Sequence, residues 1–300
     1  MSTLRSGVES KRASRPFYVR ALLAVVSFFR RLARHPVSLV GTLLVIAFVL
    51  LALFGPNIAP HRFDDLIRGA ARQSPSLEFP FGTDRLGRDI FSRVLWGARE
   101  IIAIPGIATA ISVFLGTCVG LFVGYYGGWI DELISRALDS LLSIPALVLA
   151  LVMLGTIGPS PVGIIIVIVL LYMPIVTRVI RSATLNIRNS GFIEAAKLRG
   201  ESLPYILFGE ILPSVLPALT VEAALRFSYA IFLTASLGFL GLGVQPPSPD
   251  WGRMVSESRA NYARTPWELW FPAGAIASLV IGVNLMADGL RRIFRYEGQF

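Results

Sequence analysis

Ionisable side chains are scarce in the long apolar runs of this sequence, and the one pair found there has a favourable spacing. Glu222 and Arg226 lie four residues apart in a stretch that is otherwise apolar from about 213 to 243. On a helix, a Glu four residues before an Arg is the better order for an ion pair. Two interpretations stay open: a structural pair, or a contact for a ligand that carries both an amine and a carboxylate, such as a peptide.

The usual catalytic and nucleotide-binding arrangements do not occur in this sequence. Its two histidines, His35 and His61, lie near opposite ends of the first apolar run, which places them about 30 Å apart if that run crosses a bilayer. Neither Lys11 nor Lys197 follows a glycine-rich turn of the GxxxxGK[ST] type that cradles phosphates. We therefore expect no catalytic residue, no metal site and no bound cofactor, and a membrane-embedded enzyme is disfavoured.

Composition indicates a chain whose main solvent is lipid. Of the 300 residues, 54% are hydrophobic and 16% charged, and the mean hydropathy is +0.66. The 28 Lys and Arg exceed the 19 Asp and Glu, but the excess gathers in particular loops. Such clustering indicates membrane topology rather than nucleic-acid binding. The single cysteine, Cys118, lies in an apolar run and is interpreted as a buried thiol, so an intrachain disulfide framework is excluded.

Long uncharged stretches predict an all-α polytopic protein with six transmembrane helices. The 38 uncharged residues between Asp139 and Arg178 would form one helix about 57 Å long, far more than a bilayer needs. The turn-forming sequence "GTIGPSP" at 155–161 divides them into two spans. The other spans are expected at 37–55, at about 101–124, within 213–243 and within 269–287.

Basic residues predict the orientation, because positive charge near span ends stays in the cytoplasm. The first 36 residues carry eight Lys and Arg against one acid, so both termini and the segment 182–212 are expected inside. Residues 56–99 and 244–268 then form extracytoplasmic loops. We interpret residues 17–34, within an N-terminal arm 1–36, as an interfacial amphipathic helix; a solvated arm is the alternative. Residues 291–300 form the C-terminal tail, after a core 100–290.

A charged segment, "GFIEAAKLRGESLPYILFGEILP" at 191–213, interrupts the apolar pattern. Ala195 and Ala196 predict a smooth helix face that another protein can approach closely. Gly200 suits the left-handed conformation at a helix end, and Ser202 followed by Pro204 restarts a helix. The segment is either a docking helix or an ordinary loop helix lying on lipid.

This segment resembles the EAA loop of the permease subunits of binding-protein-dependent ABC importers, with "EAAKLRG" followed by "LP" at 212–213. Further stretches resemble the dipeptide, oligopeptide and nickel branch of that family. These are "FGTDRLGRDIFSRVLWGAR" at 81–99, "SLGFLGLGVQPPSPDWGRM" at 236–254, "NLMADGLRR" at 284–292 and the early "RHPVSLVGTLLV". The similarity covers roughly residues 30 to 292 and matches the C-type member of the paired permeases.

The resemblance implies a type I importer permease in the inner membrane that takes up peptides or a related small solute. It further implies a second, B-type permease, two ATPase subunits that bind ATP and Mg, and an extracytoplasmic binding protein, with no nucleic acid. The residues expected to couple to the ATPase are Glu194, Ala195, Ala196, Leu198 and Gly200. No motif selects among dipeptides, oligopeptides, nickel chelates and other solutes.

The loop after the first span carries mixed charge, and its motif residues are Gly82, Thr83, Asp84, Gly87, Arg88, Asp89 and Arg93. They either pair with one another or contact the binding protein. On the second span, Gly116, Gly120 and Gly124 form a face without side chains, which favours close helix packing. A proton-coupled secondary transporter would be expected to carry unpaired intramembrane carboxylates, whereas Glu222 has a candidate partner.

Overall fold

The computed structural model describes residues 36–297, with side chains to residue 293. This part of the chain is helical and contains no β-strand, only an isolated bridge between Thr83 and Asp89. The all-α prediction is confirmed. The interfacial helix expected at 17–34 lies outside the described residues. The helices are α3 (Pro36–Ile58), α4 (Ile90–Tyr126), α5 (Gly128–Leu142), α6 (Ala146–Ile157), α7 (Pro161–Ile187), α8 (Gly191–Leu198), α9 (Leu212–Phe239), α10 (Trp251–Ser258) and α11 (Trp267–Glu297).

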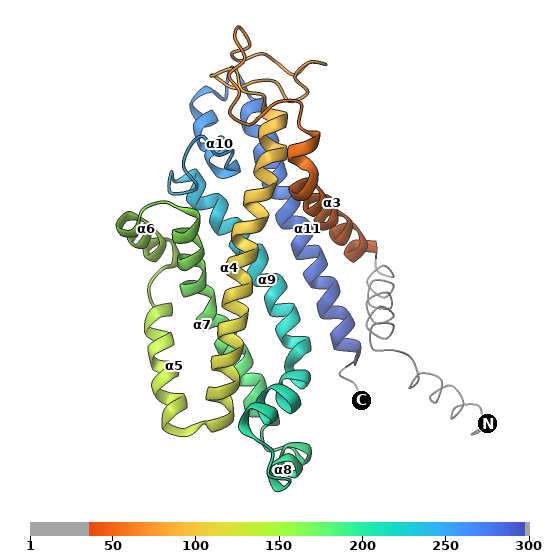
Figure 1. Ribbon diagram of the computed structural model, residues 1–300, viewed down its shortest axis with the longest axis vertical. Coiled ribbons are helices and arrows are strands. Elements are labelled where there is room, and N and C mark those ends of the chain that lie inside the picture. Colours follow the sequence, from red (N-terminus) through yellow and green to blue (C-terminus); the bar gives the residue numbers. More distant parts are fainter. Residues whose placement is uncertain (1–35, 298–300) are drawn as a thin grey trace, which may run out of the picture.

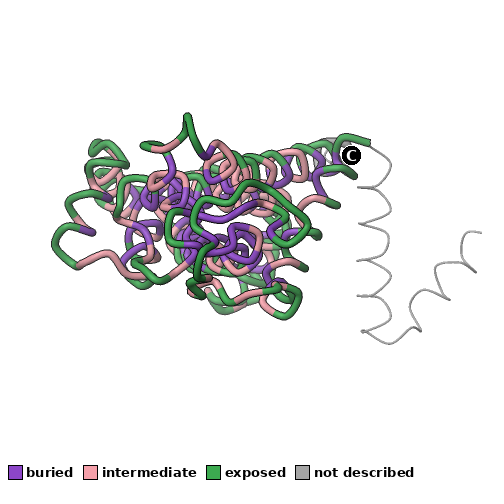
Figure 2. Tube along the Cα trace, turned by 90° about the horizontal axis from the view of Figure 1, so that it is seen from above, coloured by how far each residue is buried: buried purple, intermediate pink, exposed green. Residues whose placement is uncertain are grey.

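The long helices run side by side along the longest axis of the molecule (Figure 1). The loop 59–89 and α10 lie at one end of this bundle, and α8 lies at the other. Helix α4 is central and packs against α3, α7 and α9. Seen from above, buried backbone gathers in the middle of the bundle and exposed backbone surrounds it (Figure 2). Large apolar side chains such as Leu43 and Leu53 of α3 are exposed on the outside, as lipid-facing residues are.

Five helical segments of the described chain are long and apolar enough to cross a membrane, and a sixth crossing is possible if one bent pair counts as a span. The five are α3, α4, α7, α11 and the continuous segment Tyr205–Phe239, in which a π-helical stretch, Tyr205–Ile211, leads into α9. The bent pair is α5 with α6, whose axes differ by 82°.

The third predicted span differs most from the structure. A straight apolar helix was expected before "GTIGPSP", but α6 has only 12 residues, about 18 Å of helix, which is too short to cross a bilayer. Helix α5, the other member of the bent pair, carries four charged residues. Two of them are paired with α7, Asp131 with Arg181 and Asp139 with Arg178. Hydropathy does not detect such cross-helix neutralisation.

The second span is also longer than predicted. Helix α4 begins at Ile90 rather than near 101, so the preceding loop ends at Asp89 and not at 99. The Asp89 carboxylate accepts hydrogen bonds from the amides of Phe91 (3.2 Å) and Ser92 (3.0 Å), which satisfies donors left free in a first helical turn. A helix of 37 residues extends about 55 Å, so its charged first turns project beyond the hydrocarbon.

The glycine face on α4 packs against α7, as predicted. A β-carbon on Gly120 would lie 2.8 Å from the Thr177 carbonyl oxygen and 2.9 Å from the Ile180 Cβ. Gly116 and Gly124 meet Val176 and Thr184 of the same helix. The two backbones therefore approach closely, and contacts without side chains on one partner hold these central helices together.

Candidate functional site

Helix α8 is anchored in the bundle by two residues of one face. Ile193 and Ala196 are fully buried, whereas Phe192 is 45% exposed and Leu198 is 90% exposed. Ala195 and Glu194 are exposed as well. The expectation that Ala195 and Ala196 share one contact face is therefore wrong, because neighbouring helical residues point about 100° apart. The exposed surface of α8 comprises Phe192, Glu194, Ala195 and Leu198.

The anchor of α8 joins three of the long segments. Ile193 and Ala196 belong to an apolar cluster with Leu121 of α4, Ile180 of α7 and Val215 of α9. The Lys197 ammonium also lies 5.2 Å from the centre of the Tyr125 ring at the end of α4, a distance that allows a cation–π attraction. Displacement of α8 would therefore be transmitted directly to α4, α7 and α9.

The bend after α8 depends on Gly200. Its φ is +72°, in the left-handed region that glycine adopts without strain. A β-carbon built there would meet nothing within 4 Å, so the requirement for glycine is conformational and not steric. Arg199, just before the bend, pairs with Glu201 and Glu210, each at 3.3 Å. The predicted restart at Ser202 is observed, but the π-helical stretch Tyr205–Ile211 that follows was not anticipated.

At the opposite end, the charged loop motif is largely self-contained. Asp84 accepts hydrogen bonds from the amides of Leu86 (2.8 Å) and Arg88 (2.9 Å) and pairs with the Arg88 guanidinium at 2.5 Å. Arg88 also lies 3.6 Å from Glu257 on α10. Of the two interpretations of this motif, internal pairing describes Asp84 and Arg88, both of which are buried.

The remaining motif residues shape the same loop. Gly82 and Gly87 adopt φ of +71° and +79°, and the Thr83 hydroxyl accepts the Gln73 amide at 2.8 Å. The buried Arg93 donates to the Phe63 carbonyl at 2.8 Å. Together with the Asp89 cap of α4, these bonds form a rigid platform over the end of the bundle.

A buried carboxylate beside this platform has a structural role that sequence reasoning missed. Asp250 caps α10 by accepting the Arg253 amide at 2.8 Å. Its carboxylate lies against Gly238 and Gly243, where any β-carbon would collide with it. Burial raises the pKa of Asp250 to about 6, helped by the nearby charge of Glu100. The signal was present in the sequence as glycines and an aspartate in "GFLGLGVQPPSPDWG", but only the fold brings them together.

The sequence of this helical bundle matches two known protein families. Residues 116–295 match the family described as the binding-protein-dependent transport system inner membrane component. The chain belongs to this family. Residues 25–75 of the permease also match the N-terminal transmembrane domain of oligopeptide transport permease C.

Individual relatives cover most of the permease. It is 40% identical over 263 residues to the dipeptide transport system permease protein DppC of Alkalihalophilus pseudofirmus, covering 88% of this chain and 86% of the relative. It is also 40% identical over 270 residues to the glutathione transport system permease protein GsiD of Escherichia coli and of Shigella sonnei, covering 88% of each chain. The protein is therefore a permease subunit of an ABC importer, which works with ATPase and binding-protein partners at the inner membrane.

The fold is shared with a solved importer. The MetNI methionine ABC transporter, in an inward-facing form, matches with a TM-score of 0.54 at 20% identity, covering 68% of this chain and 95% of the other. At that identity the likeness concerns the fold alone. It supports the type I permease architecture expected from the EAA loop.

Inside the membrane, the permease pairs the two ionisable residues of α9. The Arg226 Nε lies 2.7 Å from a Glu222 carboxylate oxygen, and the two side chains are 12% and 10% exposed. The pair predicted from the i, i+4 spacing is therefore present. The Arg226 guanidinium also lies 4.9 Å from the centre of the Tyr229 ring and 5.5 Å from that of Tyr172 on α7, contacts that the spacing alone did not reveal.

Proposed function

We propose that this permease takes up di- or oligopeptides, or a related small solute, delivered by an extracytoplasmic binding protein, and that ATP hydrolysis on separate subunits drives it. The observation that carries the proposal is α8: a short helix anchored through Ile193 and Ala196 and exposing Phe192 and Leu198 at one end of the bundle. An exposed apolar face on an anchored helix suits a protein partner better than solvent.

Coupling follows from the rigidity of that anchor. An ATPase subunit that moves the exposed face of α8 would move α4, α7 and α9 together, because their side chains share one packed cluster with α8. Packed cores transmit displacement because they contain little free space. Glu194, at the start of α8, adds charge that sets the register of docking rather than its strength. This role is mechanical rather than catalytic.

The orientation that fits this role places α8 and both termini in the cytoplasm. Its support is the excess of basic residues in the first 36 positions and near the end of α11. The loop 59–89 and α10 then face the binding protein, with a B-type permease completing the transport path and two ATPase subunits beneath. Peptide cargo is supported by the relatives that are named for dipeptide and for glutathione transport. Dipeptides and glutathione are both peptides with free termini.

The test is purification of the tagged permease from gently solubilised membranes, with co-purifying subunits identified by mass spectrometry and ATPase and peptide uptake assayed after reconstitution. Gly200→Val forces a β-branched residue into the left-handed region, which costs about 1–2 kcal/mol. Gly200→Asn is the matched control, because Asn tolerates this conformation.

We expect a second permease and ATPase subunits to co-purify with wild type and with both variants. Gly200→Val should hydrolyse ATP with reduced uptake, while Gly200→Asn should transport nearly as wild type does. Recovery of the permease without any ATPase, or full uptake by Gly200→Val, would contradict the coupling role of α8.

A further inference from the structure

The Glu222–Arg226 pair lies in a helical segment that is long and apolar enough to cross a membrane. Helix α9 comprises Leu212–Phe239, so Arg226 is near its middle. Charged groups at that depth are costly and almost always face the bundle interior or a water-filled cavity. A pair required only for stability would gain little, because neutral side chains of similar size often replace a buried ion pair without loss.

The surroundings of the pair hold it in place without using its hydrogen-bonding capacity. Two tyrosine rings flank the guanidinium, Tyr172 from α7 and Tyr229 from α9. The contact between Glu222 and Arg226 is short but lacks hydrogen-bond alignment. The site is therefore positioned, yet its polar atoms stay available to another ligand.

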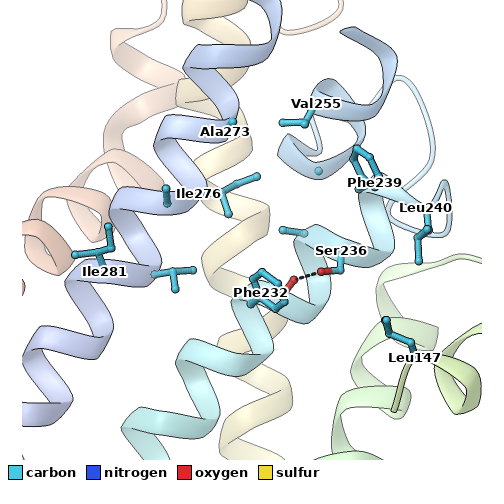
Figure 3. A pocket seen from close by; sticks show the side chains of 13 residues that line it. Leu147, Phe232, Ser236, Phe239, Leu240, Val255, Ala273, Ile276 and Ile281 are labelled. Atoms are coloured by element: carbon cyan, nitrogen blue, oxygen red, sulfur yellow. Dashed lines mark hydrogen bonds between the residues drawn. The ribbon is translucent and has the colours of Figure 1, made fainter. Parts of the chain in front are cut away.

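One side of this cluster is open. Tyr229 is 49% exposed, and Ser236 lies on the same face of α9, two helical turns further along. Ser236 lines an apolar groove of about 610 Å³ between α9, α10, α11 and the start of α6, with Phe232, Phe239 and Ile276 among its walls (Figure 3). The groove and Tyr229 therefore share one face of α9. An apolar lining with a few polar groups nearby is the usual composition of a small-molecule site.

We propose that Glu222, Arg226 and Tyr229 form a cargo-reading site in the transport path, which binds the charged termini of a peptide. This inference rests on the proposed peptide function and locates peptide recognition at these three residues. The Arg226 guanidinium pairs with the peptide carboxylate, whose planar geometry it matches, and Glu222 receives the ammonium. The phenol of Tyr229 forms the exposed side of this site.

A ligand that replaces the Glu222–Arg226 contact with contacts of its own should be a zwitterion. In the empty site the two side chains neutralise each other, so neither charge is left alone in the membrane. A peptide with both termini free supplies one charge of each sign, and the site stays neutral when the pair opens to admit it. Residues four apart on a helix are displaced by about 6 Å along its axis, and an extended dipeptide spans about 7 Å.

The first experiment removes the charges while keeping side-chain size. Glu222→Gln combined with Arg226→Met is compared with Glu132→Gln combined with Arg136→Met, an exposed pair on α5 with the same spacing. Uptake of radiolabelled dialanine is measured in proteoliposomes holding the assembled importer at saturating binding protein, alongside ATPase activity. Charge-assisted hydrogen bonds are worth enough that kcat/KM for uptake should fall about tenfold or more in the first variant, with ATPase activity retained and the second variant unaffected.

The second experiment asks whether the site meets water. Tyr229→Cys is made in a Cys118→Ser background and treated with a membrane-impermeant thiol reagent, with Leu43→Cys on the lipid-facing side of α3 as the control. We expect labelling of the thiol introduced on α9, slowed when dialanine is being transported, and none of the thiol introduced on α3. An unreactive thiol in the Tyr229→Cys variant would overturn the proposal even if the double variant fails to assemble.

Failure of the two proposals can be told apart. If the wild-type importer takes up no peptide, the peptide function fails and the cargo-reading site fails with it. If wild type imports dialanine and the neutral Glu222–Arg226 variant imports it equally well, only the cargo-reading site is refuted, and the pair is structural.

Discussion

The close approach of α4 and α7 predicts that one added methyl group loosens the bundle. Gly120→Ala would place its β-carbon 2.8 Å from the Thr177 carbonyl oxygen, inside the separation of about 3.5–4.0 Å at which non-bonded atoms attract. Both contacts, Thr177 and Ile180, belong to the interior of α7. Neither can turn away, because one is a backbone atom and the other a β-carbon.

The size of the effect follows from a matched pair of variants. Gly155→Ala in α6 adds the same methyl group at a position with nothing within 4 Å, so it gains only helix propensity, about 1 kcal/mol. Gly120→Ala gains the same propensity but overpacks the interface, which costs about 1–3 kcal/mol. The difference between the two variants isolates the packing cost. It corresponds to an apparent melting temperature roughly 2–5 °C lower for Gly120→Ala in a chain of this size.

The assay is thermal loss of helical circular dichroism in detergent for wild type and the two variants. The order of melting temperatures should place Gly155→Ala highest and Gly120→Ala below it. Equal melting temperatures for the two variants would refute the reasoning, because they would mean that the α4–α7 interface accommodates the added methyl group without a loss of stability. A melting temperature of Gly120→Ala above that of Gly155→Ala would refute it more strongly.

Two further predictions concern the loop platform. Because burial raises the pKa of Asp250 from 3.8 to about 6, the stability contributed by its proton is complete below about pH 4 and is lost as pH rises through about 6. Asp250→Asn keeps the cap without the charge, so it should raise the melting temperature near pH 8 and not near pH 4; the same shift at both pH values would contradict this. Asp89→Ala removes the cap of α4 and should cost about 1 kcal/mol, measured by denaturant or thermal unfolding, whereas Asp89→Asn should cost less; equal losses would exclude the cap as the cause.

The local structure of residues 191–213 was largely predictable from the sequence. A short helix, a bend at Gly200 and a second helix were all expected from 191–213, because capping, φ preference and the helical period act within a few residues. The sequence did not predict which face of α8 is buried. Ala196 points inward because Leu121 and Ile180 come from other helices to cover it, and no local pattern encodes their position.

Spans were predicted well where a helix is apolar along its length and poorly where charges are neutralised by a neighbour. Helices α3, α7 and α11 were recognised because hydrocarbon thickness imposes a minimum apolar length. Helix α5 was missed because Asp131 and Asp139 make it look soluble until Arg181 and Arg178 are placed beside it.

The sequence alone therefore indicated an α-helical membrane protein, the helix–bend–helix at 191–213 and the Glu222–Arg226 pair, since these depend on composition and on contacts between near neighbours. The importer family was indicated by the resemblance of its motifs. Tertiary structure decided the rest: the charge network of the loop 59–89, the glycines packed against Asp250 and the two tyrosines around Arg226. Each of these joins residues from distant segments. Their energies depend on distance and burial, which exist only once the helices have packed.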